Sequence, residues 1–313
     1  MLAALVAFAV AAAATLLLTP FIRSAAVDAD LLDQPGGRKI HVRAIPRLGG
    51  AAMVAAFGVA VLIGLLVAGA VAPRPAGVLL PALVGIGMVA LVGLVDDLRD
   101  LSPLAKLVGQ LAAAIAVVAL GLSFRDLATP WGSVSLGVLG PIITVGWLVA
   151  VANAVNLIDG LDGLAGGVAL TALLAFAIIA AMLGATVVLL LCAAGAGAVL
   201  AFLAYNRPPA SIIMGDAGSM FLGMLLATSA VALVEARPAH IALPTAILAL
   251  GVPLADMAWA ILRRLAAGRS IFAADSSHIH HQLMARGLGR GQVTVLLVAA
   301  SGLLGLLAVL LAR

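Results

Sequence analysis

The chain has 313 residues, of which 65% are hydrophobic and only 10% are charged, and its mean hydropathy is +1.27. This composition excludes a soluble globular domain and predicts an integral membrane protein. A single cysteine, Cys192, excludes a disulfide framework. The uncharged stretches long enough to cross a membrane are 1–22, 48–73, 75–95, 107–124, 127–158, 163–206, 217–234, 238–255 and 291–312.

Two of these stretches are too long for one helix. Residues 163–206 must turn back once, and Gly184 lies where that turn is expected. Residues 127–158 begin with Ala128-Thr-Pro-Trp-Gly-Ser, so residues 123–138 are assigned to an external loop containing a short hairpin. The expected fold class is an all-α polytopic membrane protein of about ten transmembrane helices, forming one domain over residues 1–313.

Basic residues are unevenly divided between the two sides of this topology. Only four of the 17 Lys and Arg residues, Arg74, Arg125, Arg237 and Arg313, fall on the side that holds both termini. By the positive-inside rule the other side is cytoplasmic, and both termini face outward. The pI of about 10.2 follows from this asymmetry and gives no reason to expect nucleic acid as a partner.

The segment Asn153-Ala-Val-Asn156-Leu-Ile-Asp159-Gly-Leu-Asp162-Gly163 follows a long apolar run. In a continuing helix, Asn153, Asn156 and Asp159 would share one face. Carboxylates at the C-terminal end of a helix are opposed by the helix dipole, so a nearby cation, most naturally Mg²⁺, is expected to compensate them. The alternative is that the two Asp-Gly pairs only mark turns, which leaves the asparagines unexplained.

The first cytoplasmic loop, residues 33–50, is basic and rich in glycine, and it contains Arg38, Lys39 and His41. Such a loop could capture a phosphate, because glycines let the backbone approach an anion closely. It could equally be a positive-inside signal that contacts anionic lipid head groups.

A second acidic site is predicted at Asp96 and Asp97, where an apolar stretch ends. Adjacent carboxylates at a helix C-terminus repel each other, and metal binding or proton abstraction would explain them. Pairing with Arg99 and Lys106 is the structural alternative. Lys106 is also placed to hold a phosphate at the membrane surface.

Two further aspartates border apolar stretches. Asp216, in Met214-Gly-Asp-Ala-Gly-Ser, precedes a helix and could cap its N-terminus or belong to a metal-phosphate site. Asp256 is expected about two turns inside the membrane, where a carboxylate is normally paired or functional. Its partner would be Arg263, Arg264 or a basic group on a neighbouring helix.

Residues 263–287 form a cytoplasmic loop with His278, His280 and His281. The sequence has no His-Glu-x-x-His motif and no nearby cysteine, which argues against a closed zinc site. Imidazoles here could instead bind a pyrophosphate or sugar hydroxyls.

Six ordered motifs between residue 33 and about residue 287 carry a resemblance to a known family. They are Asp33-x-Pro-x-x-Arg-Lys-x-His, Ile-Pro-Arg-Leu-Gly-Gly, Asp96-Asp97, the segment 153–163, Met-Gly-Asp-Ala-Gly-Ser and His-Ile-His-His. The set resembles the polyprenyl-phosphate N-acetylhexosamine-1-phosphate transferases, the glycosyltransferase 4 family of WecA, TagO and MraY. All six motifs lie on the predicted cytoplasmic side, so the match is far more specific than a single fingerprint.

The resemblance implies an enzyme that moves a sugar 1-phosphate from a UDP-N-acetyl sugar onto undecaprenyl phosphate and releases UMP. It implies Mg²⁺ as cofactor, with Mn²⁺ as an alternative, and an active site facing the cytoplasm in the inner membrane of a bacterium. The expected partners are the UDP-sugar, undecaprenyl phosphate and membrane lipids, and a homodimer is left open. The product would begin a cell-envelope polysaccharide such as O-antigen.

The resemblance also implies roles for individual residues. Asp216 looks like the principal metal ligand, while Asp96 and Asp97 correspond to an acidic pair assigned to metal binding, nucleotide contact or deprotonation of the lipid phosphate. The predicted catalytic residues are Asp96, Asp97, Asp159, Asp216 and His280. The predicted metal ligands are Asp97, Asn156, Asp159 and Asp216. The predicted substrate-binding residues are Arg38, Lys39, His41, Lys106, Asn153, Asn156, Arg263, His278 and His281.

The histidine motif indicates a branch within the family. Members that use a UDP-MurNAc-pentapeptide have three consecutive histidines, whereas Asp275-x-x-His-Ile-His-His looks like the WecA and TagO branch. The expected donor is therefore UDP-GlcNAc, with UDP-MurNAc-pentapeptide or another UDP-amino sugar as the alternative.

Other classes fit parts of the sequence less well. A secondary transporter would explain Asp256 in the membrane, but the polar residues gather at one face and not at the midplane. A CDP-alcohol phosphotransferase would share Asp159-Gly-Leu-Asp162-Gly, but no Ala-Arg follows. An intramembrane aspartyl protease would need two facing aspartates inside the bilayer. The transferase hypothesis requires that Asp97, Asp159 and Asp216 converge beneath the inner leaflet.

Overall fold

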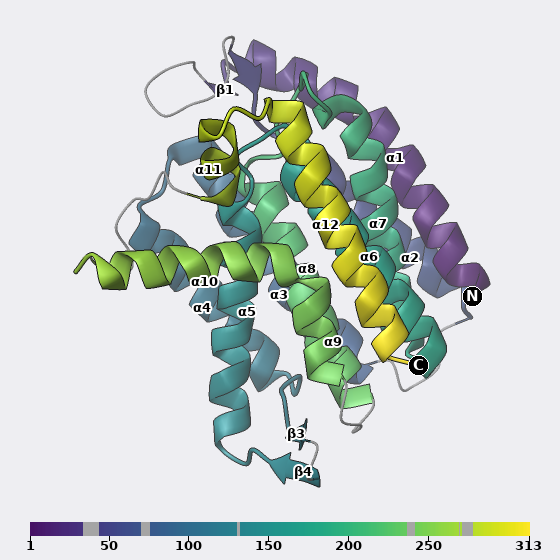
Figure 1. The fold of residues 1–313 in the computed structure, drawn as a ribbon. Helices are drawn as coiled ribbons and strands as arrows, with labels where there is room; N and C mark the ends of the chain where they lie inside the picture. Colours follow the sequence, from purple (N-terminus) through teal and green to yellow (C-terminus); the bar gives the residue numbers. More distant parts are fainter. Residues whose placement is uncertain (34–43, 70–75, 130–131, 237–241, 269, 271–277) are drawn as a thin grey trace.

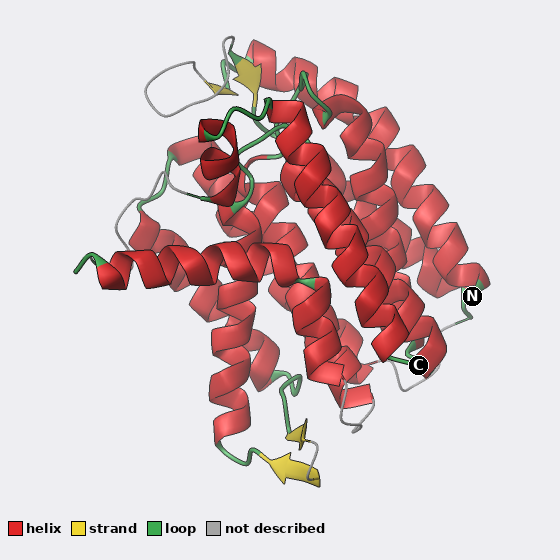
Figure 2. Ribbon diagram, viewed as in Figure 1, coloured by secondary structure: helices red, strands yellow, loops and turns green. Residues whose placement is uncertain are grey.

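The computed structural model describes residues 1–33, 44–69, 76–129, 132–236, 242–268, 270 and 278–313. Within these ranges the chain is almost entirely helical, with two short antiparallel strand pairs (Figure 2). The predicted site residues Arg38, Lys39 and His41, and Asp275 of the histidine motif, lie outside the described residues.

The elements follow one another along the chain in the order shown by the colours of Figure 1. The helices are α1 (Leu2–Asp28), α2 (Gly49–Val67), α3 (Ala76–Arg99), α4 (Pro103–Ala119), α5 (Leu139–Leu157), α6 (Leu164–Leu183), α7 (Thr186–Asn206), α8 (Gly215–Ala236), α9 (Ala242–Ala249), α10 (Gly251–Ala266), α11 (Ile279–Ala285) and α12 (Arg290–Leu311). The strands are β1 (Leu32–Asp33), β2 (Ile45–Pro46), β3 (Asp126–Thr129) and β4 (Gly132–Ser135).

Eight helices in the described part of the chain are long and apolar enough to cross a membrane: α1, α2, α3, α5, α6, α7, α8 and α12. Together α9 and α10 pass the same test, but they are bent by 83° at their junction. The remaining apolar helix, α4, has only 17 residues. The all-α polytopic architecture is therefore confirmed, while the number of ten spans and the outward-facing termini stay predictions.

The two long apolar stretches divide as expected. Gly184 separates α6 from α7 with a positive φ of 67°, a conformation that glycine adopts without steric cost. In the expected hairpin region, β3 (Asp126–Thr129) pairs antiparallel with β4 (Gly132–Ser135). The predicted turn and strand pair are confirmed, while the external position of the hairpin stays a prediction.

The stretch 238–255, expected to form one membrane span, is not a straight helix in the part that the structure describes. The helix breaks at Leu250, and α10 then runs across the bundle, as Figure 1 shows. Pro253 lies in the first turn of α10, where its missing N–H is not needed, but it could not continue the helix of α9. Asp256 therefore lies on a transverse helix and not two turns inside a straight span.

At the centre of the bundle, α8 is buried along its apolar length and is packed by α2, α3, α5, α6 and α7. Two close approaches require glycine, since a Cβ on Gly50 of α2 would meet the backbone of Gly218, and one on Gly93 of α3 would meet that of Asp216. The first turn of α8 is thus held between α2 and α3. This turn lies at the end of the bundle that carries β1 and α11, opposite the β3–β4 hairpin (Figure 1).

Candidate active site

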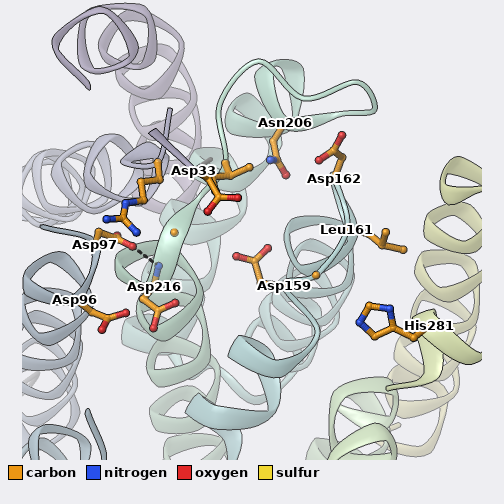
Figure 3. A pocket seen from close by; sticks show the side chains of 13 residues that line it. Asp33, Asp96, Asp97, Asp159, Leu161, Asp162, Asn206, Asp216 and His281 are labelled. Carbon is orange, nitrogen blue, oxygen red and sulfur yellow. Dashed lines mark hydrogen bonds between the residues drawn. The ribbon is translucent and has the colours of Figure 1, made fainter. Parts of the chain in front are cut away.

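A polar cavity of about 310 Å³ opens at this end of the bundle. Figure 3 shows aspartates approaching a common space from separate elements. The side chains that line it include six aspartates: Asp33 of β1, Asp96 and Asp97 of α3, Asp159 and Asp162 of the α5–α6 turn, and Asp216 of α8. Asp97, Asp159 and Asp216 therefore do converge, as the transferase hypothesis requires.

Asp97 holds the N-terminus of α8 from a neighbouring helix. Its two carboxylate oxygens accept the backbone N–H groups of Asp216, at 2.8 Å, and of Ala217, at 3.0 Å. A carboxylate is favoured at this position because it satisfies unpaired N–H groups and meets the positive end of the helix dipole. A Cβ on Gly215 would meet the same carboxylate. The interpretation of Asp216 as its own helix cap is therefore wrong, because Asp97 supplies the cap.

Lys106, in the first turns of α4, joins two of the predicted catalytic carboxylates. Its Nζ donates to Asp216 at 2.8 Å and to Asp96 at 3.1 Å. The other oxygen of Asp96 accepts the backbone N–H of Leu101 at 2.7 Å. The pairing of Asp96 with Lys106, considered as the structural alternative, is thus present, and it extends to Asp216. A contact of Lys106 with a phosphate stays a prediction.

Asp159 lies just beyond α5, which ends at Leu157. The expected single helical face of Asn153, Asn156 and Asp159 is therefore wrong. Asn153 instead exchanges hydrogen bonds with Gln110 of α4, and Asn156 donates to Ser219 of α8 at 2.9 Å.

Asp159 is also the carboxyl of the cavity whose negative charge is most clearly disfavoured by its surroundings. Burial, together with the nearby carboxylates of Asp216, Asp97 and Asp162, raises the pKa of Asp159 from 3.8 to about 8. Without a cation this carboxyl holds its proton at neutral pH. A divalent ion bound here would have to displace that proton.

The three histidines take different positions around α11. His281 lines the cavity, whereas His280 is 1% exposed and packs on the turn at Gly160, where a Cβ would meet its ring. Burial lowers the pKa of His280 to about 4, so this ring is neutral at physiological pH. His278 precedes α11, and its Nδ1 lies 2.8 Å from a carboxylate oxygen of Asp256. Of the partners considered for Asp256, a basic group on a neighbouring element is the one that the structure shows.

Comparison with known proteins shows the family of the chain that forms this cavity. A model of glycosyl transferase family 4 matches residues 79–234, which include Asp96, Asp97, Asp159 and Asp216. A Bacillus subtilis protein named "Probable undecaprenyl-phosphate N-acetylglucosaminyl 1-phosphate transferase" is 34% identical over 304 residues, covering 96% of this chain and 83% of the relative. The chain belongs to the polyprenyl-phosphate N-acetylhexosamine-1-phosphate transferase family.

Two more relatives extend the likeness. An undecaprenyl-phosphate alpha-N-acetylglucosaminyl 1-phosphate transferase of Escherichia coli is 31% identical over 297 residues, covering 93% of this chain and 79% of the relative. A decaprenyl-phosphate N-acetylglucosaminephosphotransferase of Mycobacterium tuberculosis is 34% identical over 292 residues, covering 84% of this chain and 71% of the relative. The similarity thus reaches well beyond the segment that matches the family model.

Several predicted site residues of this family member lie away from the cavity lining. Asn153 and Asn156 form hydrogen bonds to neighbouring helices, and His278 and His280 are buried and do not line the cavity. Arg263, in the last turn of α10, is not among the lining residues either. Contacts of these residues with a substrate stay predictions.

Arg47 is a lining residue that the analysis of the sequence did not single out. Its backbone bridges to Ile213 beside α8, and its guanidinium donates to Asp100 at 2.9 Å. The motif Ile-Pro-Arg-Leu-Gly-Gly was the available signal. Arg47 is 53 residues from Asp100 in sequence and still further from Ile213, so no local pattern pointed to either contact.

The donor atoms of the cavity suit a hard cation. Among the described residues, no three His, Cys, Asp or Glu side chains are close enough to form a complete metal site by themselves. Mg²⁺ does not require such a cage, since it is usually bound by one or two carboxylates together with substrate phosphates and water. The raised pKa of Asp159 is a second sign that this group of carboxylates lacks positive charge. The cavity therefore fits a magnesium ion shared with a phosphorylated ligand.

Proposed function

We propose that this chain transfers N-acetylglucosamine 1-phosphate from UDP-GlcNAc to undecaprenyl phosphate, forming the lipid diphosphate sugar and UMP. The observation that carries the proposal is the cavity in which aspartates from four separate segments meet at one end of an apolar bundle. The names of the relatives support the same acceptor and sugar. The histidine motif supports UDP-GlcNAc over a peptide-bearing donor.

The proposed reaction is an exchange of phosphate bonds. An oxygen of the lipid phosphate attacks the β-phosphorus of the UDP-sugar, a new phosphoanhydride forms, and the bond to the oxygen of UMP breaks. The second pKa of a phosphate monoester is about 6, so the attacking group is already largely ionised at neutral pH and needs no strong base. We favour this direct attack over a covalent aspartyl-phosphate intermediate.

The main task of the protein is to bring two anions together. Arg47 lines the otherwise acidic cavity, and Lys106 adds positive charge next to it through its ion pairs with the lining residues Asp96 and Asp216. When substrates bind, Lys106 can exchange a carboxylate for a phosphate oxygen without moving far, since its amine is already held by two helices. Asp96 then keeps Lys106 in place through the remaining ion pair.

A bound Mg²⁺ would neutralise charge on the diphosphate and favour departure of UMP. We propose Asp159 and Asp216 as the residues that hold it, because both line the cavity and neither is used as a helix cap. Asp97 would contribute through the position of α8, and His281 would contact the sugar or the diphosphate. We place the site at the inner membrane, facing the cytoplasm, and the distribution of basic residues supports the cytoplasmic side.

The test is release of UMP by the purified protein in detergent. We expect UMP from UDP-GlcNAc only when undecaprenyl phosphate and a divalent ion are both present, with none from UDP-MurNAc-pentapeptide. Release from the peptide-bearing donor alone would reassign the substrate. Absence of UMP with every UDP-sugar of a panel would reject the proposal, and uptake of a solute by proteoliposomes would then favour a transporter.

A further inference from the structure

Asp256 has no part in the reaction described above, yet it is one of the most deeply buried carboxylates of the described chain. It is 2% exposed, on the transverse helix α10. A buried carboxylate must be compensated by hydrogen bonds or by an opposite charge. Its two compensating contacts both reach the start of α11.

The two oxygens of Asp256 have separate partners. One accepts the backbone N–H of Ile279, the first residue of α11, at 2.7 Å. The other lies 2.8 Å from Nδ1 of His278. Because an ionised carboxylate only accepts hydrogen bonds, Nδ1 must carry the proton, which leaves Nε2 to act as an acceptor in the neutral ring.

These contacts connect α10 to the cavity through α11. The rings of His278 and His280 are stacked, with 6.0 Å between their centroids, and the centroids of His280 and His281 lie 4.2 Å apart. His280 rests on Gly160 of the α5–α6 turn, and His281 lines the same cavity as Asp159.

The apolar side of α11 packs against the core through Ile279, Leu283 and Met284. Asp256 holds its first residue, which is two residues before His281, so this clamp fixes the end of the helix from which His281 projects.

We propose that Asp256 is a positioning residue that clamps the N-terminus of α11 and selects the ring form of His278, thereby aligning His281 with the sugar donor. The proposal rests on the proposed function for the identity of that donor. Its structural part, the clamp between α10 and α11, does not.

The kinetic test compares three variants. Asp256→Asn keeps the size of the side chain and an acceptor for Ile279 but loses the charge that faces His278. His278→Ala keeps Asp256 and its contact with Ile279, and the double variant Asp256→Asn/His278→Ala removes the pair. Asp126→Asn, on the exposed strand β3 at the opposite end of the bundle, is the matched control.

We expect each single variant to lower kcat/KM for UDP-GlcNAc at least tenfold, while the KM for undecaprenyl phosphate stays close to that of the control. The Tm of Asp256→Asn should also stay close to that of the control, whereas His278→Ala should lower it, because a buried carboxylate then loses one of its two partners. The double variant should lose no more than about twofold beyond either single variant, since both act through one contact. Three results would overturn the proposal. In the first, the losses in kcat/KM of the two single variants multiply in the double variant. In the others, kcat/KM for UDP-GlcNAc stays within twofold of the control, or its loss across the variants is proportional to the fall in Tm.

Hydrogen–deuterium exchange tests the clamp without any substrate. In Asp256→Ala, the amides of residues 279–283 should exchange at least tenfold faster than in wild type, while those of α8 stay protected. Unchanged exchange in α11 overturns the clamp even if the enzyme transfers GlcNAc 1-phosphate. If exchange in α11 is faster in Asp256→Ala as expected but the wild-type protein releases no UMP, only the proposed function is overturned.

Discussion

Asp97 and Asp216 line the same cavity, but their carboxylates have different partners. Asp97 accepts two backbone N–H groups of α8, whereas Asp216 pairs with the amine of Lys106. An oxygen that already holds a helix terminus is less available to a ligand than one that faces a mobile ammonium group. At the scale of single residues, the neighbours of each carboxylate decide between a structural and a chemical role.

Asp216→Asn is expected to abolish transfer that depends on Mg²⁺, by at least about 100-fold, because it removes a carboxylate proposed to hold the cation that neutralises the diphosphate. Its Tm should change little. Asp97→Ala should instead lower the stability by ~0.5–2 kcal/mol through loss of the α8 cap. UMP release measures the activity of Asp216→Asn, and thermal unfolding in detergent measures the stability of both variants. Near-normal activity of Asp216→Asn would show that the metal is bound by other residues.

Asp159 makes divalent-ion binding depend on pH. Its pKa of about 8 means that an ion must displace a proton at neutral pH, so the apparent affinity should rise as the pH increases from 6.5 to 8.5. Titration calorimetry with Mg²⁺ at three pH values measures this rise. Asp159→Asn should weaken binding and flatten the dependence, and a slope equal to that of wild type would contradict this role.

The same pKa has a consequence for stability without metal. A carboxyl whose pKa is raised in the folded state favours folding while it is protonated, and this contribution declines between about pH 4 and pH 8. The Tm of metal-free wild type should therefore fall over this range relative to that of Asp159→Asn.

At the scale of elements, two short segments position residues of the site: the N-terminal turn of α8 and the seven-residue helix α11. Each begins at a carboxylate from another helix, Asp97 for α8 and Asp256 for α11. This arrangement ties the position of Asp216 to α3 and that of His281 to α10. The turn at Gly160 is the place where α11 meets the α5–α6 connection.

Gly160→Ala should displace α11, since the new methyl group would meet the ring of His280. A loss of at least about tenfold in kcat/KM is expected, because a misplacement of about 1 Å at an active site can cost 100-fold. Gly146→Ala is the control, as a Cβ there meets nothing within 4 Å. Kinetics of both variants on UDP-GlcNAc decide the matter, and equal activities would show that α11 tolerates the shift.

At the scale of the whole molecule, the bundle places its polar chemistry at one end and its β3–β4 hairpin at the other. By the positive-inside rule, the distribution of Lys and Arg predicts that the polar end faces the cytoplasm. A nucleotide sugar made in the cytoplasm and a lipid held in the membrane can meet only at such an edge. The orientation of the bundle is therefore part of the proposed function.

Labelling of cysteines in intact cells tests this orientation. Cys192 is buried and can be replaced by Ala to give a background without thiols. In that background, a membrane-impermeant maleimide should label Ser135→Cys on β4 from outside, and Arg286→Cys after α11 only once the cells are opened. Labelling of Arg286→Cys in intact cells would reverse the topology.

Much of the architecture could be predicted from the chain alone. Uncharged stretches mark segments that must be satisfied by helical hydrogen bonds in lipid, Gly184 marks a turn, and polar residues separate the stretches. The same local signals identified the aspartates and histidines of the site, because charged groups beside apolar helices require a reason. The convergence of Asp97, Asp159 and Asp216 was predicted through the family resemblance and not through any local pattern.

Other features were decided only by tertiary structure. The cap of α8 by Asp97 joins residues 119 apart, the bridge from Lys106 to Asp216 joins residues 110 apart, and the clamp of Asp256 on His278 crosses a break between helices. Sequence periodicity indicates which face of a segment is apolar, but it does not indicate which residue on another segment that face will contact. Hydrogen bonds and ion pairs between helices depend on how the helices pack, so these contacts, and the separate roles they assign to each carboxylate, appear only in the folded chain.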